Sequence, residues 1–199
     1  MSTFPVMERF YTLQGEGAYQ GQAAYFIRLG GCDVGCVWCD VKESWDASKH
    51  PVVDVETIVT DAGASGTQLA VVTGGEPLMH DCAPLTAGLK QHGFQTNIET
   101  SGTHPLSGDW DWICFSPKKF KKPLPEYYQQ ASELKVIVYH PSDLKWAEGH
   151  RAQMHNQCLL YLQPEWSVRE KVTPLIIDYI KENPAWRLSL QSHKYVNIP

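Results

Sequence analysis

The chain has 199 residues, of which 43% are hydrophobic and 7 are Trp, so it is expected to fold around a buried core and not to be disordered. A formal net charge of −5, with one basic cluster at residues 118–122 that fits a solvated loop, gives no sign of a nucleic-acid-binding surface. No apolar stretch reaches the ~18 residues of a membrane-spanning helix, and the first residues do not resemble a signal peptide, so we expect a cytoplasmic protein without nucleic-acid or membrane partners.

Runs of apolar and β-branched residues, taken along the chain, predict strands that alternate with helices. The expected strands cover residues 24–29, 69–73, 96–100, 112–116, 134–139, 158–163 and 187–191. Asp54 is placed to cap a helix, and Asp81 to cap a second helix that ends before Gly93. A third helix is expected over residues 168–181, where Pro174 either kinks the helix or marks its first turn.

Strands that alternate with helices are typical of a parallel sheet with right-handed crossovers. A closed eight-stranded barrel of this kind usually needs ~250 residues, which is more than this chain has. We therefore expect an α/β fold in which residues 1–199 form one domain, an open, partial TIM-like barrel of about six parallel strands with reduced helices. Functional groups in such folds lie where strands end, and several expected strands end in polar or glycine-rich strings.

Three cysteines stand close together directly after the first expected strand. Cys32, Cys36 and Cys39 have the spacing C-x3-C-x2-C, which supplies three thiolates and no fourth. A structural zinc or an ordinary electron-transfer cluster takes four protein ligands. A four-iron cluster held by three cysteines leaves one iron open to a substrate or cofactor. The triplet therefore predicts an iron–sulfur site; the alternative is a zinc site completed by a distant His or Cys.

Two further strings lie where a ligand is expected to bind. The string Gly-Gly-Glu-Pro at residues 74–77 follows a predicted strand, where the glycines let the main chain approach a ligand and Glu76 can accept hydrogen bonds from an amine. The string Gln-Gly-Glu-Gly at residues 14–17, with Arg28, forms a polar clamp in which Arg28 holds a carboxylate. His193 follows the last expected strand. Taken alone, each string also fits an ordinary tight turn.

Together these strings resemble the radical S-adenosylmethionine (SAM) superfamily, and within it the family of 7-carboxy-7-deazaguanine synthases. The cysteine triplet and the Gly-Gly-Glu-Pro string are typical of the superfamily. The string Leu-Gln-Gly-Glu-Gly at residues 13–17 and the string His-Lys-Tyr at residues 193–195 are typical of the synthases. The resemblance implies a homodimeric lyase that converts 6-carboxy-5,6,7,8-tetrahydropterin into 7-carboxy-7-deazaguanine, with loss of ammonia, in queuosine precursor biosynthesis.

The resemblance also implies cofactors and binding residues. Cys32, Cys36 and Cys39 would bind a 4Fe–4S cluster that receives electrons from a donor such as flavodoxin. The residues implied for SAM are Gly74, Gly75, Glu76, Thr100, Ser101, Ser116, Lys118 and Gln163. The residues implied for the pterin substrate are Leu13, Gln14, Gly15, Glu16, Gly17, Arg28, His193 and Pro199, the last through its terminal carboxylate. No side chain is assigned as a catalytic acid or base, because the chemistry is carried by radicals.

One residue departs from the family pattern. Family members commonly carry Cys-Asp-Thr, and the Thr hydroxyl helps to bind a Mg²⁺ ion, whereas this chain has Cys39-Asp40-Val41. A Val side chain has no oxygen for a hard cation. Either Mg²⁺ is held by substrate, water and another oxygen ligand, or the enzyme uses the ion weakly or not at all. We predict reduced dependence on Mg²⁺.

Two other functions fit parts of the same pattern. An activase that generates a glycyl radical on a partner protein, or another radical SAM enzyme, would use the same cysteine triplet. A non-catalytic electron carrier or a zinc-stabilised module would need the metal site alone. The compact set of polar strings favours a small-molecule substrate over a protein substrate.

Overall fold

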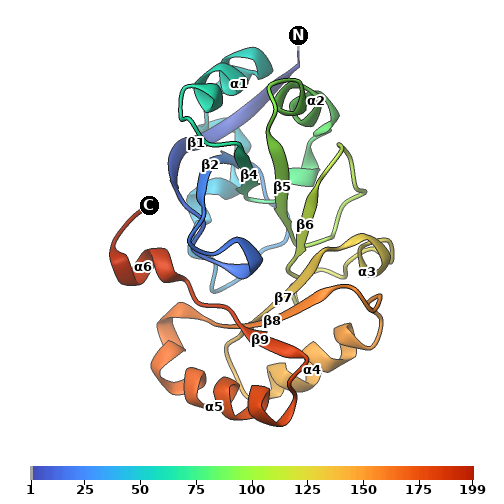
Figure 1. The fold of residues 1–199 in the computed structure, drawn as a ribbon. Coiled ribbons are helices and arrows are strands. Elements are labelled where there is room, and N and C mark those ends of the chain that lie inside the picture. The colour runs from blue at the N-terminus through green and yellow to red at the C-terminus, as the bar shows by residue number, and fades with distance from the viewer. Residues whose placement is uncertain (1) are drawn as a thin grey trace.

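The backbone is organised around one curved sheet, and the structure, a computed structural model, describes residues 2–199 (Figure 1). The strands are β1 (Thr3–Leu13), β2 (Ala23–Leu29), β3 (Val52–Asp54), β4 (Leu69–Gly74), β5 (Gln95–Thr100), β6 (Trp112–Phe115), β7 (Glu133–Val138), β8 (Leu159–Pro164) and β9 (Trp186–Leu188). Their order in the sheet is β3-β1-β2-β4-β5-β6-β7-β8-β9. Neighbours are parallel from β2 to β9, whereas β1 is antiparallel to β2 and β3. Because β3 and β9 are the two ends of this order, the predicted open barrel is confirmed.

Every strand expected from the sequence is confirmed, with boundaries that shift by one to three residues. β1 and β3 were not predicted from the sequence. In β1 a β-bulge between Val6 and Glu8 shifts the register, so the alternation of buried and exposed side chains is irregular. β3 has only three residues, which is too short to show any periodic pattern.

The helices are α1 (Val55–Gly63), α2 (Ala83–Gln91), α3 (Tyr127–Gln130), α4 (Ser142–Arg151), α5 (Arg169–Glu182) and α6 (Ser192–Val196). Figure 1 shows α1 and α2 at one end of the molecule and α4 and α5 at the other, with α6 beside β1 and β2. β5 and β6 are joined without an α-helix, and α3 is a single turn. The predicted reduction of the helices is therefore confirmed.

The helix starts were predicted with mixed success. Asp54 caps α1 as expected, since its Oδ1 accepts a hydrogen bond from the N–H of Thr57 at 2.8 Å. The expectation for Asp81 is wrong by one residue, because Cys82 occupies the N-cap position of α2 and Asp81 lies just before it. Pro174 lies inside α5 and not in its first turn, so that alternative is wrong. The helix begins earlier because Val172 belongs to its buried face.

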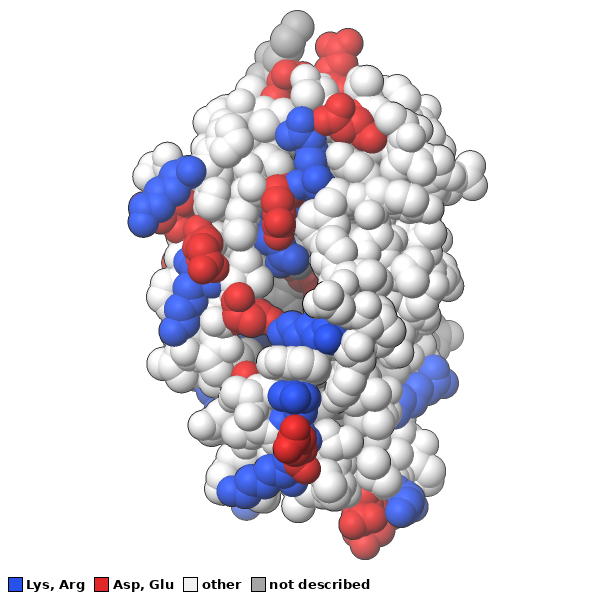
Figure 2. Space-filling view, turned by 90° about the vertical axis from the view of Figure 1, so that its left-hand side faces the viewer, with Lys and Arg blue, Asp and Glu red and all other residues white. Residues whose placement is uncertain are grey.

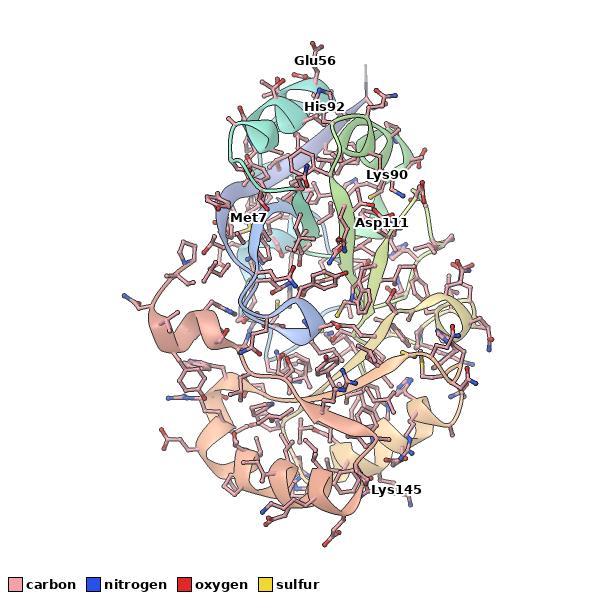
Figure 3. The ribbon with its side chains drawn as sticks, in the orientation of Figure 1. Met7, Glu56, Lys90, His92, Asp111 and Lys145 are labelled. Atoms are coloured by element: carbon pink, nitrogen blue, oxygen red, sulfur yellow. The ribbon has the colours of Figure 1, made fainter. Side chains whose placement is uncertain are left out.

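Polar side chains hold the amino ends of β5 and β6 together. Lys90 on α2 lies 2.7 Å from Asp109 and 3.0 Å from Asp111, the residue before β6 (Figure 3). Asp111 also accepts a hydrogen bond from the N–H of Thr96 at 2.9 Å. Burial by itself would raise the pKa of Asp111, but these donors hold it below its ordinary value. This network stabilises one end of the barrel and leaves the carboxyl ends of the strands for ligands.

Among residues 2–199, none of the helices has the length and the hydropathy of a membrane span.

Candidate active site

A cavity of about 260 Å³ lies between the carboxyl ends of the strands and the turn that joins β1 to β2. Nearly all of the candidate residues line it: Leu13, Gln14, Gly15, Glu16, Arg28, Cys32, Cys36, Cys39, Gly74, Gly75, Glu76, Thr100, Ser101, Ser116, Lys118, Gln163, His193 and Pro199, together with Val41. Gly17 is the exception. It lies behind the cavity wall, where its N–H donates to Ser189 Oγ at 3.0 Å. Figure 2 shows a hollow in this face of the molecule, edged by charged side chains of both signs.

The loop after β2 carries the three cysteines and is closed by its own backbone. The N–H of Gly31 donates to the carbonyl of Ser44 at 2.6 Å, and the N–H of Cys32 donates to the carbonyl of Trp45 at 3.1 Å. Gly31 and Gly35 have φ angles of 106° and 73°, which other residues rarely adopt. The sequence therefore shapes this loop before any metal binds.

The cysteines fit a four-iron cluster better than a single zinc ion. All three are free thiols and line the cavity. Within residues 2–199, no three His, Cys, Asp or Glu side chains come together closely enough to hold one metal ion. Zinc would need four ligands on one ion, whereas in a 4Fe–4S cluster each cysteine binds a different iron. Burial raises the pKa of Cys36 to about 11, so iron binding has to supply the free energy for the loss of that proton.

Two glycines at the end of β4 bring this strand against the cysteine loop. The N–H of Gly75 donates to the carbonyl of Leu29 at 3.0 Å, and the N–H of Glu76 donates to that of Gly31 at 2.8 Å. A Cβ on Gly74 would lie 2.2 Å from Leu29 O, and one on Gly75 would lie 2.1 Å from Gly31 O. The glycines are thus required by a close backbone approach within the protein, in addition to any approach to a ligand.

Glu76 is buried, and its carboxylate is already engaged by the protein. Oε1 accepts hydrogen bonds from Thr100 Oγ1 at 2.6 Å and from the N–H of Leu78 at 3.2 Å. Oε2 accepts from the N–H of Ser101 at 2.8 Å and from Ser101 Oγ at 2.5 Å. These bonds join the ends of β4 and β5, so Glu76 organises the wall of the cavity. Its expected contact with a ligand amine stays a prediction.

The other residues implied for SAM lie at the ends of β6 and β8. Lys118 Nζ donates to Ser116 Oγ at 2.7 Å, and burial lowers the pKa of Lys118. Gln163 Oε1 accepts a hydrogen bond from Ser189 Oγ at 2.7 Å. These pairs orient polar groups in the cavity wall before a ligand arrives.

A buried ion network stands at the centre of the cavity wall. Lys135 on β7, whose side chain is only 3% exposed, lies 2.5 Å from Glu16 and 3.2 Å from Glu99. Burial alone would lower the pKa of Lys135, but the surrounding carboxylates raise it well above its ordinary value. Burial would likewise raise the pKa of Glu16, but Lys135 and a hydrogen bond from Gln191 hold it at about 2. The cavity therefore presents the ionised carboxylate of Glu16. The neighbouring Glu99 accepts a hydrogen bond from Gln14 Nε2 at 3.0 Å.

The segment after β9 closes the open side of the barrel. Ser192 donates to the carbonyl of Gly15 from both its N–H and its Oγ, each at 2.9 Å. The His193 ring lies against Gly15, where a Cβ would come within 2.1 Å of Nδ1, and burial lowers the pKa of His193. Lys194 Nζ lies 2.7 Å from Asp40 in the cysteine loop. The chain end thus joins the β1–β2 turn to the loop that holds the cluster.

Arg28 lies in the cavity wall as expected, but with an unexpected partner. Its Nε donates to Glu8 on β1 at 2.6 Å. Because that bond uses Nε, the two terminal nitrogens of the guanidinium remain for a ligand carboxylate.

Four residues that line the cavity were given no binding role from the sequence: Asp40, Glu99, Lys135 and Gln191. A signal for Lys135 was present, since a Lys two residues after Glu133 interrupts an apolar strand. Charged side chains within a buried strand need partners, and such partners gather at functional sites. Glu99 and Gln191 stand in polar strings at the ends of expected strands, which places them at the candidate site but gives neither a role.

Comparison with known proteins gives consistent matches over the whole chain. The model of the radical SAM superfamily matches residues 26–122. The chain is 55% identical to the 7-carboxy-7-deazaguanine synthase of Flavobacterium psychrophilum, over 98% of this chain and 92% of the relative. It is 37% identical to the synthase of Escherichia coli K12, over 98% and 99% of the two chains. The crystal structure of QueE from Escherichia coli matches with a TM-score of 0.87 and 34% identity, over 96% of this chain and 95% of that chain.

Proposed function

The chain belongs to the 7-carboxy-7-deazaguanine synthase family of the radical SAM superfamily, and from this we propose how its cavity performs the family's reaction. The protein is a radical SAM lyase of queuosine biosynthesis that uses a 4Fe–4S cluster and SAM. Its substrate is 6-carboxy-5,6,7,8-tetrahydropterin, whose ring contracts with loss of ammonia. One observation carries this proposal. A single cavity joins the three cysteines, the glycine-rich end of β4 and the carboxylates around Lys135.

The chain's own residues supply binding, orientation and exclusion of water. Cys32, Cys36 and Cys39 would hold the cluster, which when bound would supply the electron for reductive cleavage of SAM. The residues at the ends of β4, β5, β6 and β8 hold SAM: Gly74, Gly75, Glu76, Thr100, Ser101, Ser116, Lys118 and Gln163. Since Thr100 and Ser101 donate to Glu76, their contribution is to fix that carboxylate beside the ligand.

The substrate is held by complementary charge. The pterin ring presents neighbouring N–H groups at one edge and a carboxylate at the other. Glu16 and Glu99 are the acceptors for the N–H edge, and Arg28 is the donor for the carboxylate. Gln14, His193 and the terminal carboxylate of Pro199 complete the enclosure. The ordered chain end keeps water away from a reactive radical.

The function is tested by anaerobic reconstitution with iron and sulfide, followed by incubation with SAM, dithionite and the tetrahydropterin. We expect 7-carboxy-7-deazaguanine to form, as identified by mass spectrometry. One equivalent of ammonia should be released for each equivalent of this product. Cys36→Ala should bind less iron and form no product. A cluster-loaded protein that cleaves SAM but leaves the pterin unchanged would contradict this substrate and favour another radical SAM reaction, such as activation of a glycyl-radical protein.

Four further properties of the protein are proposed from separate observations. We propose one domain over residues 1–199, because one sheet runs through the described chain. We propose a homodimer, since Tyr11 and Val52 are 53% and 70% exposed and offer apolar surface to a second copy. Free cysteines and a metal cluster fit the reducing cytoplasm. We propose no nucleic-acid or membrane partner, given the net charge of −5.

Val41→Thr should make the enzyme respond more strongly to Mg²⁺. Val41 lines the cavity with Asp40, so a Thr hydroxyl there would add an oxygen ligand beside an existing carboxylate. We expect Mg²⁺ to raise kcat/KM of the variant several-fold more than that of the wild type, measured at constant ionic strength. Val41→Ala is the control, because it changes the volume without adding oxygen. Equal responses of the Thr and Ala variants would count against a cation site at this position.

A further inference from the structure

Ser189 follows β9 directly, and its side chain is 0% exposed. Its N–H donates to the carbonyl of Leu162 at 3.0 Å, which extends the parallel pairing of β9 with β8 by one residue (Figure 1). The backbone therefore fixes Ser189 beside Gln163, the residue that follows Leu162 in β8. The reaction proposed above assigns no role to Ser189.

The hydroxyl of Ser189 links two parts of the cavity wall. Its Oγ accepts a hydrogen bond from the N–H of Gly17 at 3.0 Å and donates one to Gln163 Oε1 at 2.7 Å. A serine hydroxyl has one proton, and a backbone N–H can only donate. Because the hydroxyl oxygen receives the N–H of Gly17, its own proton remains for the amide oxygen of Gln163.

This arrangement fixes the orientation of the Gln163 amide. Its oxygen is held by Ser189, so its NH₂ group is directed to the other side, where a hydrogen bond from Gln163 helps to lower the pKa of Glu16. A reversed amide would place its oxygen against the carboxylate of Glu16. Since Glu16 and Gly17 are neighbours in the chain, the four residues form a closed ring of contacts. One member of this ring is proposed to bind the pterin, and another is proposed to bind SAM.

A second buried side chain holds the same turn. Glu133 on β7 is 3% exposed, and its Oε2 accepts a hydrogen bond from the N–H of Ala18 at 2.9 Å. A Cβ on Gly17 would lie 2.3 Å from Glu133 Oε1, so the turn is packed closely against this carboxylate. Glu133 thus fixes the turn against β7, whereas Ser189 fixes it against a residue implied for SAM.

We propose that Ser189 is a positioning residue that keeps Glu16, on the pterin side of the cavity, and Gln163, on the SAM side, in one fixed arrangement. The inference rests on the proposed function, which gives these two residues to different ligands. Hydrogen transfer between two bound molecules requires their reacting carbons to be in contact, and a misplacement of about 1 Å is costly. Because its side chain is buried behind its two partners, Ser189 acts through them and not on a ligand.

Two substitutions of Ser189 and one matched control test the proposal. Ser189→Ala removes both hydrogen bonds, and Ser189→Cys fills the space of the hydroxyl with a thiol that forms only weak hydrogen bonds. The control is Ser107→Ala, outside the cavity lining. Ser107 Oγ likewise accepts from a backbone N–H, that of Cys82 at 3.0 Å, and donates to a carbonyl, that of His80 at 3.2 Å.

The first measurement is ligand binding to the protein without its cluster, so that differences in reconstitution do not enter. The probe is pterin-6-carboxylate, an aromatic analogue of the substrate, followed by its fluorescence. We expect the Kd of both Ser189 variants to rise about tenfold, because the turn that carries Glu16 loses one of its anchors. The Kd of Ser107→Ala should stay within about twofold of the wild type.

The second measurement uses the reconstituted enzyme with SAM, dithionite and the tetrahydropterin. We expect the amount of 5′-deoxyadenosine released per 7-carboxy-7-deazaguanine formed to rise several-fold in both Ser189 variants, because a radical formed beside a misplaced substrate is lost to side reactions. Loss of folded protein alone would lower both amounts in the same proportion. The control should keep the wild-type ratio.

A third measurement asks whether Ser189 acts through Gln163. The affinity of the reconstituted protein for SAM should fall in Ser189→Ala and in Gln163→Ala. The double variant Ser189→Ala/Gln163→Ala should bind SAM no more weakly than Gln163→Ala alone, since residues that act as a unit are not additive.

Three results would overturn the proposal: Ser189→Cys equal to the wild type in pterin affinity and product ratio, Ser189→Ala equal to Ser107→Ala in both, or additive losses of SAM affinity in the double variant. The Cys variant decides the matter where Ser189→Ala does not fold. A wild type that binds SAM but not the pterin would remove the proposed substrate. The SAM affinities would then still decide whether Ser189 positions Gln163.

Discussion

Gly75→Ala is expected to lose most of its iron and about 100-fold or more of its activity, because a methyl group at this position displaces the cysteine loop. A Cβ there would lie 2.1 Å from Gly31 O, 2.7 Å from Gly31 C and 2.9 Å from the Cβ of Cys32. The first two are backbone atoms that the loop's hydrogen bonds hold in place, so no side-chain rotation relieves the clash. The loop has to move, and the geometry of the cluster ligands moves with it. Iron content per chain and product formation after identical reconstitution provide the measurement.

Gly149→Ala is the matched control for this substitution. It makes the same chemical change inside α4, where an added Cβ would meet nothing within 4 Å. Its iron content and activity should equal those of the wild type, and the better helix propensity of Ala should raise the free energy of unfolding by up to ~1 kcal/mol. Full iron content and full activity in Gly75→Ala would show that the contact between β4 and the cysteine loop is not needed to hold the cluster.

Lys135→Met should be the most damaging single change at the substrate end of the cavity. It removes the positive charge between Glu16 and Glu99, whose side chains are 13% and 24% exposed, and leaves each carboxylate without its cationic partner. Breaking a buried ion pair on one side typically lowers the free energy of unfolding by about 3–5 kcal/mol. We also expect kcat/KM for the pterin to fall by about 100-fold or more, because a protonated or displaced Glu16 no longer accepts the N–H groups of the substrate. Denaturant unfolding and steady-state kinetics measure the two effects separately.

The pH dependence distinguishes loss of charge from mere loss of packing. In the wild type the pKa of Glu16 is lowered from 4.5 to about 2, so its contribution to stability is complete above pH 4.5 and is lost as the pH falls toward 2. In Lys135→Met the positive charge no longer opposes the effect of burial, so the pKa of Glu16 rises. The kcat/KM of this variant should therefore fall as the pH decreases through the raised pKa of Glu16. Lys135→Arg should keep the wild-type profile. Lys135→Met/Glu16→Gln should regain stability without activity. A Met variant with the wild-type pH profile would contradict the charge role of Lys135.

Most of the parallel strands could be predicted because they are buried on both faces. Strands such as β4 and β8 then appear in the sequence as short, continuous apolar runs between turn residues. β1 could not be predicted in this way, since it is half exposed and carries a bulge. Missing β1 had a consequence for the site. The string at residues 14–17 looked like a turn before the first strand, whereas it is the turn of an antiparallel pair and enters the cavity from the opposite direction to the strand ends.

Among the residues that line the cavity, those within local motifs and known family strings were expected, whereas the ionic partners Lys135 and Glu99 were not. The three cysteines and the glycines after β4 stand at fixed short spacings, and all of them line the cavity. Glu76, expected to accept hydrogen bonds from an amine, shows the limit of such motifs. The string indicates that an acid is required, but the hydrogen bonds that engage this acid come from Thr100 and Ser101 on the next strand.

The amino-acid sequence by itself determined the cysteine spacing, the order of the parallel strands along the chain and the kinship with a radical enzyme family, because these depend on near neighbours. Only the tertiary structure decided which charges meet. Lys135 and Glu16 are 119 residues apart in the chain, and no local pattern pairs them. They meet because the sheet curves so that β7 faces the turn between β1 and β2. A buried charge requires a partner, but its own sequence neighbourhood does not specify which one.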